Sequence, residues 1–202
     1  MNKKMIWIIS GIIAILIPVI LVLCLNYFVW VEEPQVVEPQ TVQNGGTIQP
    51  VGNQGLYEFK SKYGYKLSYN PKYKVDLSGS MYDFYISNAD NTVNVQITPM
   101  PKDESITSIT TKEQWDAAMG DLGECMEFNR TSFNGMDALI AHYILADEKS
   151  ENVQDVLVAT LIGEEKSYTY CYTASNKASE LEAQQIGGIL YTISEWKDEN
   201  HD

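Results

Sequence analysis

The sequence predicts an α+β domain, with a single antiparallel β-sheet flanked by helices as an α/β/α sandwich, preceded by an N-terminal transmembrane helix. Three features predict it. An uncharged apolar run extends from Met5 to Val31, strand-like segments joined by short turns follow, and two amphipathic segments lie near residues 112–122 and 176–193. No stretch between neighbouring strands has the pattern of a βαβ crossover, so the sheet is expected to be antiparallel.

The apolar run of residues 5–31 is long enough to cross a membrane, because about 20 helical residues span the hydrocarbon core. Lys3 and Lys4 precede it, and Glu32 is the first charged residue after it. The positive-inside rule places the stub of residues 1–4 in the cytoplasm and the C-terminal bulk outside. We therefore expect a single-pass protein of the cell membrane.

Two processing routes fit this run less well. A cleaved signal peptide has a shorter apolar core and a small-residue cleavage site, and no Ala-x-Ala pattern follows here. Lipid attachment requires a small residue before the modified cysteine, whereas Leu23 precedes Cys24. An uncleaved anchor is the better interpretation.

A stalk is expected between the anchor and the domain. Residues 32–55 are rich in proline, glutamine and glycine and show no apolar periodicity. Such a segment cannot bury a core, so it should be extended or disordered. The extracytoplasmic α+β domain is then expected over residues 56–196, and residues 197–202 form an acidic tail that frays.

Beyond the apolar run the chain is strongly acidic. Residues 32–202 carry 12 Lys and Arg and all 27 Asp and Glu, which gives a formal charge of −15. Nucleic acids and anionic lipid headgroups are bound largely through Lys and Arg, so this charge disfavours both as partners. It is consistent with a cationic partner or simply with solubility.

The first strands are expected as two hairpins. Apolar and polar residues alternate over 57–60 and 65–69, on either side of a turn that contains Gly64. Residues 81–86 and 92–97 form the second pair. Two prolines, at positions 99 and 101, are expected to end this part of the sheet.

A helix is expected next, with Thr110 or Thr111 as its N-cap and Gly123 as its end. Its apolar residues recur at spacings of three and four and share one face: Trp115, Ala118, Met119 and Leu122. We interpret Trp115 as a core anchor rather than as a ligand platform.

Four further strands are expected over residues 124–132, 136–146, 153–162 and 167–173, with Asn134-Gly135 as a hairpin turn. The second and third are apolar on both faces, so both faces should be covered. A final helix should start near Ser175 or Asn176. Its apolar stripe contains Ala178, Leu181, Ile186, Ile189, Leu190 and Ile193.

Two cysteines lie in the expected domain, Cys125 and Cys171. In an exported domain they can form one disulfide, and only one pairing is available. They can equally be two buried free thiols that behave as small hydrophobes. The sequence leaves both alternatives open.

Three segments resemble PsbP-like domains, the fold shared by the photosystem II extrinsic P subunit and the yeast Mog protein. They are YGYKLSYNP at residues 63–71 with Tyr73 after it, FNGMDA at 133–138, and YTYCYTA at 168–174 followed by an amphipathic helix. The resemblance covers residues 57–196. It implies an antiparallel sheet with helices on both faces and a mostly non-enzymatic role in binding or assembly; no photosynthetic partner carries over.

No catalytic, cofactor-binding or metal-ligating pattern stands out in the sequence. His142 is the single histidine before the tail, and it has no familiar zinc-ligand spacing with Cys125 or Cys171. A Gly-x-Ser-x-Gly nucleophile elbow and a phosphate-binding glycine pattern are missing from the sequence. We therefore expect no enzymatic activity, no cofactor and no metal.

The sequence thus favours a membrane-anchored extracytoplasmic binding or assembly module whose ligand it does not identify. One alternative is a cell-envelope enzyme with an unrecognised active site. A deep pocket that holds His142 beside an ionisable partner would favour that enzyme. The other alternative is a ligand-sensing ectodomain.

Overall fold

The computed structural model describes residues 40–41, 46–51, 55–146 and 153–197. The chain divides into two units, Met1–Val37 and Glu38–Asp202, and the described residues all belong to the second. The predicted membrane anchor and cytoplasmic stub lie outside the described residues. Within those ranges, no helix is both long and apolar enough to span a bilayer.

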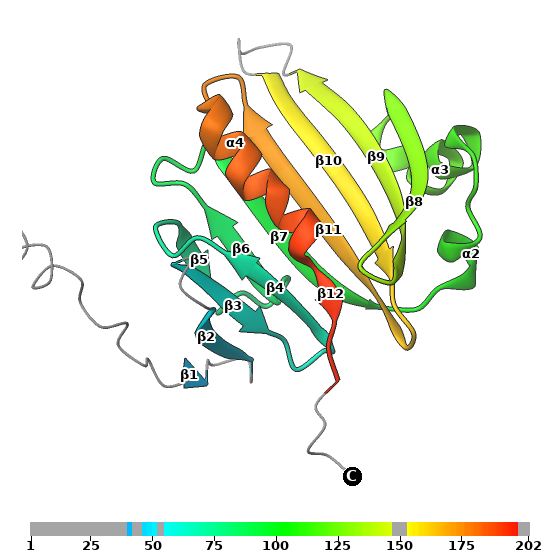
Figure 1. Ribbon diagram of the computed structural model, residues 1–202. Coiled ribbons are helices and arrows are strands. Elements are labelled where there is room, and N and C mark those ends of the chain that lie inside the picture. The colour runs from blue at the N-terminus through cyan, green and yellow to red at the C-terminus, as the bar shows by residue number, and fades with distance from the viewer. Residues whose placement is uncertain (1–39, 42–45, 52–54, 147–152, 198–202) are drawn as a thin grey trace, which may run out of the picture. The chain divides into compact units, whose positions relative to one another are not determined.

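The larger of two antiparallel sheets contains seven described strands in the order β5-β6-β7-β11-β10-β9-β8 (Figure 1). The Asn134-Gly135 turn, with φ of 52° and 82°, joins the last two as the sequence predicts. The strands are β5 (Lys74–Asp76), β6 (Phe84–Ser87), β7 (Val93–Pro101), β8 (Glu127–Phe133), β9 (Met136–Ala146), β10 (Val153–Ile162) and β11 (Lys166–Ser175).

The smaller sheet has the order β1-β2-β3-β4-β12, so the prediction of a single sheet is wrong. The hairpin of β3 and β4 forms as predicted, but it packs by its face rather than its edge against the larger sheet. Phe59, for example, has its ring centroid 5.1 Å from that of Phe84 on β6. The strands are β1 (Gln40–Thr41), β2 (Thr47–Val51), β3 (Leu56–Lys60), β4 (Tyr65–Tyr69) and β12 (Ser194–Glu195).

Two of these strands fall inside residues 32–55, where the sequence predicts a disordered stalk. That prediction is wrong for β2, which pairs along its whole length with β3. Its Ile48 packs against the buried core. The composition of residues 47–51 does not indicate a strand. This segment is ordered by backbone hydrogen bonds to the open edge of β3, and an extended segment of almost any sequence can form such bonds.

Helices cover both faces of the larger sheet, as the sequence predicts. In Figure 1, α4 crosses one face over β11 and β7, while α2 and α3 lie on the β8 side. The helical segments are α2 (Glu104–Thr107), α3 (Lys112–Ala118), η2 (Gly120–Leu122), α4 (Glu180–Gly187) and η3 (Gly188–Thr192). The Thr111 side chain caps α3 by accepting a hydrogen bond from the amide of Gln114.

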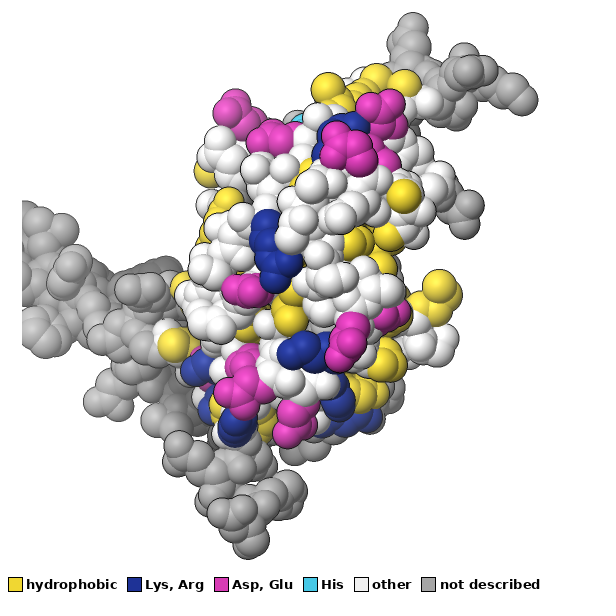
Figure 2. Space-filling model, turned by 90° about the vertical axis from the view of Figure 1, so that its right-hand side faces the viewer, with side chains coloured by type: hydrophobic (Ala, Val, Ile, Leu, Met, Phe, Trp, Pro, Cys, Tyr) yellow, Lys and Arg dark blue, Asp and Glu magenta, His cyan; other side chains and the backbone are white. Residues whose placement is uncertain are grey.

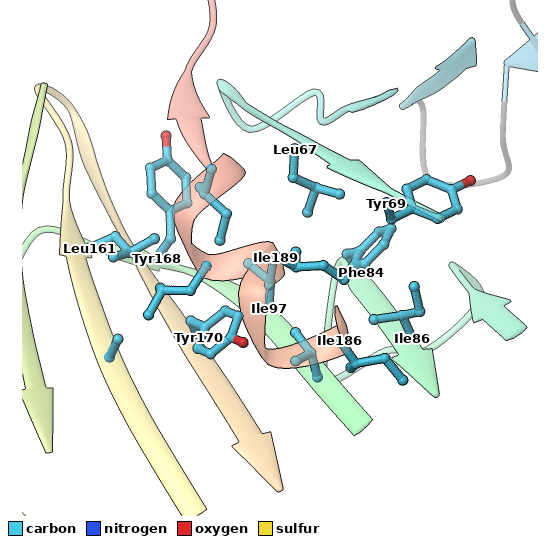
Figure 3. Close-up of a cluster of buried hydrophobic side chains, with 14 of the residues drawn as sticks. Leu67, Tyr69, Phe84, Ile86, Ile97, Leu161, Tyr168, Tyr170, Ile186 and Ile189 are labelled. Carbon is cyan, nitrogen blue, oxygen red and sulfur yellow. The ribbon is translucent and has the colours of Figure 1, made fainter. Parts of the chain in front are cut away.

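The first core lies between the larger sheet, the smaller sheet and α4. Figure 3 shows side chains from all three converging, and its labelled residues are Leu67, Tyr69, Phe84, Ile86, Ile97, Leu161, Tyr168, Tyr170, Ile186 and Ile189. A buried polar group also joins the two sheets. Asp83, just before β6, accepts hydrogen bonds from Ser61 Oγ (2.5 Å) and Tyr65 Oη (2.8 Å). Burial, together with this carboxylate, holds the pKa of Tyr65 well above its usual range.

The second core lies on the opposite face, beneath α2 and α3. Trp115 is fully buried there, which confirms its role as a core anchor, and its Nε1 donates to Tyr143 Oη at 2.7 Å. Cys125 and Cys171 both contribute to this core, and in the described structure both thiols are free. Cys171 is on β11, whereas Cys125 precedes β8. Two strands intervene, about 14 Å at the usual spacing, which exceeds the span of a disulfide.

Several element boundaries differ from the predicted ones, and two of these differences have a clear structural cause. β7 continues through Pro99 and Pro101 because β6 has already ended, so this edge of β7 needs no amide donors from the prolines. The final helix starts at Glu180 rather than near Ser175, since β11 extends to Ser175. Leu181, which the predicted stripe includes, is 60% exposed.

The separation of the two thiols predicts the outcome of an alkylation experiment. The full chain, denatured without reductant, should take up alkyl groups at Cys24, Cys125 and Cys171. In the native state Cys125 should react slowly, because burial and the nearby Asp116 raise its pKa to about 11. Mass spectrometry reads the count, and a chain that gains one alkyl group instead of three contains a disulfide.

The buried indole hydrogen bond predicts a stability change. Tyr143→Phe leaves the Trp115 N–H without its partner and should lower the free energy of unfolding by about 1–3 kcal/mol, measured by urea denaturation. Tyr191→Phe is the matched control, because that side chain is 70% exposed, and it should change stability little. Equal effects of the two variants would contradict the assigned role of the hydrogen bond.

Candidate functional site

A groove runs between α4 and the strands beneath it, and we call it the α4 groove. It has a volume of about 440 Å³, and strands β10 and β11 form its floor while α4 and η3 form its wall. Its polar and aromatic lining includes Asp155, Tyr172, Glu180, Gln184 and Tyr191. This volume is within the range of small-ligand sites in proteins.

The position of α4 is fixed by packing at its C-terminal end. Ile186 is fully buried, and the Ile189 and Leu190 side chains of η3 are each only 3% exposed. Tyr170 Oη, on β11, donates a hydrogen bond to the carbonyl of Gly187 at 2.8 Å. A Cβ atom on Gly187 would lie only 3.1 Å from the Tyr172 ring, so glycine allows the helix to approach the sheet closely.

The N-terminal part of α4 contributes a carboxylate rather than a buried contact. Glu180 is exposed in the first turn, and its Oε1 accepts a hydrogen bond from Gln184 Nε2 at 3.2 Å. Asp155 faces it from β10 and is half exposed. Among the described residues that line the α4 groove, none is Lys or Arg, so its lining is acidic.

Two tyrosines give the α4 groove its aromatic surface. Tyr172 is partly buried on β11, and Tyr191 of η3 is 70% exposed. Burial raises the pKa of Tyr172, and the charge of Asp155 raises it further. The Tyr172 phenol therefore stays protonated at neutral pH.

His142 lies beside this groove, paired with one of its carboxylates. The imidazole Nε2 is 2.5 Å from Asp155 Oδ1, and the two side chains project from the neighbouring strands β9 and β10. Glu127 of β8 lies directly across from His142 in the register of the sheet. The histidine that the sequence places on an apolar strand is thus at the edge of a cleft, with acidic residues on both neighbouring strands.

A second hollow continues the groove toward the turn that follows β11. It has a volume of about 270 Å³ and shares Asp155, Tyr172 and Ala183 with the α4 groove. Its far end is lined by Asn176. The two hollows form one elongated surface whose shared carboxylate lies near the middle, a shape that suits an extended segment.

Several acidic side chains elsewhere on the domain contact Lys or Arg. Among the described residues Asp155 and Glu180 of the α4 groove have no such contact, although Asp155 is paired with His142. Lys112 contacts Asp116 and Glu124, and Arg130 contacts Asp137 at 3.3 Å. Figure 2 shows such mixing on one face, where Lys and Arg side chains lie beside Asp and Glu. Carboxylates near aromatic rings can bind cationic groups, which gain charge-assisted hydrogen bonds and cation–π contacts.

The three residues that the sequence analysis considered as possible ligands, Cys125, Cys171 and His142, do not come together in one site. Cys125 and Cys171 are in the second core, on the face of the sheet opposite to His142. Within the described ranges, no group of three or more His, Cys, Asp or Glu side chains is placed to hold a metal ion.

Sequence reasoning did not identify the lining of the α4 groove. Asp155 and Glu180 are 25 positions apart in the sequence, on a strand and on a helix. One signal was available: Asp155 is a charged residue on the otherwise apolar side of a two-faced strand. A charged side chain at such a position indicates that the covering helix leaves this part of the sheet exposed to solvent.

Comparison with known proteins gives the fold of this domain. No protein-family model and no curated protein matches the sequence. The solution structure of cyanobacterial PsbP from Synechocystis sp. PCC 6803 has a TM-score of 0.55 at 15% identity, over 72% of this chain and 95% of that protein. A crystal structure from Bacteroides thetaiotaomicron has a TM-score of 0.50 at 15% identity, over 72% of this chain and 50% of that one. The domain has a PsbP-like fold, which confirms the resemblance.

The hydrogen bond from Tyr170 to Gly187 predicts a local change in dynamics. Tyr170→Phe should loosen α4 and η3, so amide hydrogen exchange over residues 180–192 should accelerate while α3 remains protected. Tyr143→Phe is the reciprocal control, because it removes a hydrogen bond on the other face. Faster exchange spread evenly over both faces in the Tyr170 variant would contradict this role.

Proposed function

We propose that this protein is a membrane-tethered extracytoplasmic binding module, and that its α4 groove holds a basic segment of a partner protein. The acidic and aromatic lining of the α4 groove, in which no described residue is Lys or Arg, carries the proposal. A Lys or Arg side chain can contact Asp155 and Glu180 through its charge and the tyrosine rings through its face.

The charge of the whole domain supports a cationic partner. Residues 32–202 have a formal charge of −15, and such a field attracts basic segments and accelerates their association. The elongated form of the two adjoining hollows suits several residues of an extended chain. Anionic ligands are disfavoured by the same charges.

The apolar run of residues 5–31 supports a position at the membrane. Its length fits one helical span, and the two lysines before it favour a cytoplasmic N-terminus. The partner is then a protein of the extracytoplasmic compartment, or an extracytoplasmic part of a membrane protein. The tether confines the domain near the bilayer and so raises its effective concentration for such partners.

A second candidate function is an enzyme that uses His142 as a general base. The observation in its favour is the 2.5 Å contact with Asp155, since a carboxylate that orients an imidazole is a common catalytic pair. Against it, burial keeps the neighbouring Tyr172 phenol protonated, so Tyr172 does not supply an activated nucleophile. The binding module is the function that the geometry supports better.

Crosslinking in intact cells tests the binding module. A photoreactive amino acid in place of Tyr191 should form an adduct with a partner, and Asp155→Asn with Glu180→Gln should reduce its yield at least about tenfold. Glu104→Gln with Glu165→Gln removes the same charge at exposed sites away from the α4 groove and should preserve the adduct.

The same cells distinguish the second candidate. If the adduct survives in the Asp155 and Glu180 variant, the acidic lining does not hold the partner and the binding proposal fails. His142→Ala keeps both carboxylates, so a binding module should retain its adduct. Loss of a turnover activity in that variant, with binding intact, would favour the enzyme.

A further inference from the structure

A second cavity lies on the opposite face of the larger sheet from the α4 groove, beneath α2 and α3. It has a volume of about 400 Å³, and we call it the hydroxyl pocket. Its floor consists of Thr160 on β10 and of Ser167 and Thr169 on β11. The function proposed above does not use it.

The register of the sheet brings these hydroxyl groups together. Thr160 lies directly opposite Thr169, and directly opposed residues have Cβ atoms about 5 Å apart. Ser167 is two residues along β11 from Thr169, so its side chain emerges on the same face. Three hydroxyl-bearing side chains therefore line one small area of the floor.

One of these hydroxyl groups lacks a partner. Ser167 is 4% exposed, and its Oγ is buried without a hydrogen-bond partner among the described residues. A buried polar group left unpaired carries a desolvation cost that no hydrogen bond offsets. A molecule that offers the hydroxyl a hydrogen bond would recover that cost.

The walls of the hydroxyl pocket are apolar. Met100 and Pro101 at the end of β7, Ile106 of α2, and Met119 after α3 line them. Methionine side chains adapt to the shape of an occupant, so these walls can close around a hydrocarbon body. A pocket with a polar floor and apolar walls matches an apolar molecule that has one polar end.

The charges at the mouth restrict the class of molecule further. Asp103 lines the pocket and is exposed, and hydrogen bonds from Ser105 hold its pKa below the usual range. Its carboxylate already accepts from the Ser105 amide at 2.8 Å and the Ser105 hydroxyl at 2.7 Å. The nearby Lys102 ammonium donates to the carbonyl of Gly163 at 3.1 Å. An anionic group would meet Asp103 at the mouth, so a neutral molecule is favoured.

We propose that the hydroxyl pocket is a binding site for a small, uncharged, apolar molecule with a hydroxyl or carbonyl group, which pairs with Ser167 Oγ. The hydrocarbon body contacts the Met100, Ile106 and Met119 side chains, and the polar end reaches the floor between β10 and β11. This site is separate from the α4 groove, so the two can be occupied at the same time.

The test is a titration of the full chain in lipid nanodiscs with cyclohexanol, monitored through methyl signals by NMR. The signals of Ile106 and Met119 should shift to saturation, while those of Ile86 and Ile186 in the first core stay in place. Cyclohexanecarboxylate, the matched anion, should bind at least about tenfold more weakly.

Variants connect the binding to the floor and to the cavity itself. Ser167→Ala should weaken cyclohexanol binding about two- to tenfold, the loss expected for one hydrogen bond. Thr173→Val removes a hydroxyl group elsewhere on the same strand and should leave the affinity unchanged. Ile106→Trp, a substitution in a half-buried wall, should fill the pocket and abolish the shift of the Met119 signal.

Three results would overturn the proposal. They are the absence of saturable shifts at Ile106 and Met119, equal affinities of the parent chain and the Ser167 variant, and equal binding of the alcohol and the carboxylate. The first would mean that water alone partners the Ser167 hydroxyl.

Discussion

The structure depends on the need to cover both faces of one apolar sheet. Strands β9, β10 and β11 contribute buried side chains alternately to a core on each side, so neither face can meet water. One face is covered by α4 together with the smaller sheet, and the other by α2 and α3. The helices are few and short, however, and they leave parts of both faces uncovered. The α4 groove lies along the side of α4, and the hydroxyl pocket lies between α2 and the end of α3.

The two cavities differ in chemistry because their floors differ. On the α4 side, charged residues emerge where the strands pass beyond the helix, and Asp155 and His142 lie at that boundary. On the other side, the floor is uncharged and bears hydroxyl groups beneath apolar walls. A PsbP-like fold can therefore offer one surface to a charged macromolecular segment and an independent cavity to a small neutral molecule. The binding proposed for the two places would draw on different forces, and salt would affect mainly the first.

The sequence predicts the local features of this fold well. The bounds of β9 and β10 match the predicted ones, and the Asn134-Gly135 pair marks the turn before β9. Trp115 is the core anchor that the helix pattern predicts. Long-range features are not predictable in this way. The second sheet depends on how the β3–β4 hairpin packs, and the strand at residues 47–51 depends on a free edge of β3. The α4 groove combines residues from β10, β11 and α4. The alternation of apolar and polar residues describes one element at a time, so it does not predict which elements come together.

The smaller sheet also determines how the domain responds to tension. Any pull transmitted from the N-terminal side enters first through β1, whose Gln40 pairs with Ile48, and then through β2, whose Thr47 pairs with Lys60 at the open end of the β2–β3 hairpin. Antiparallel hydrogen bonds loaded from an open end break one after another, so little force is needed to peel β2 away. The larger sheet is not in the line of that pull, and its long central pairs stay intact while β2 detaches. β1 and β2 can thus detach in turn and lengthen the chain before force reaches the larger sheet.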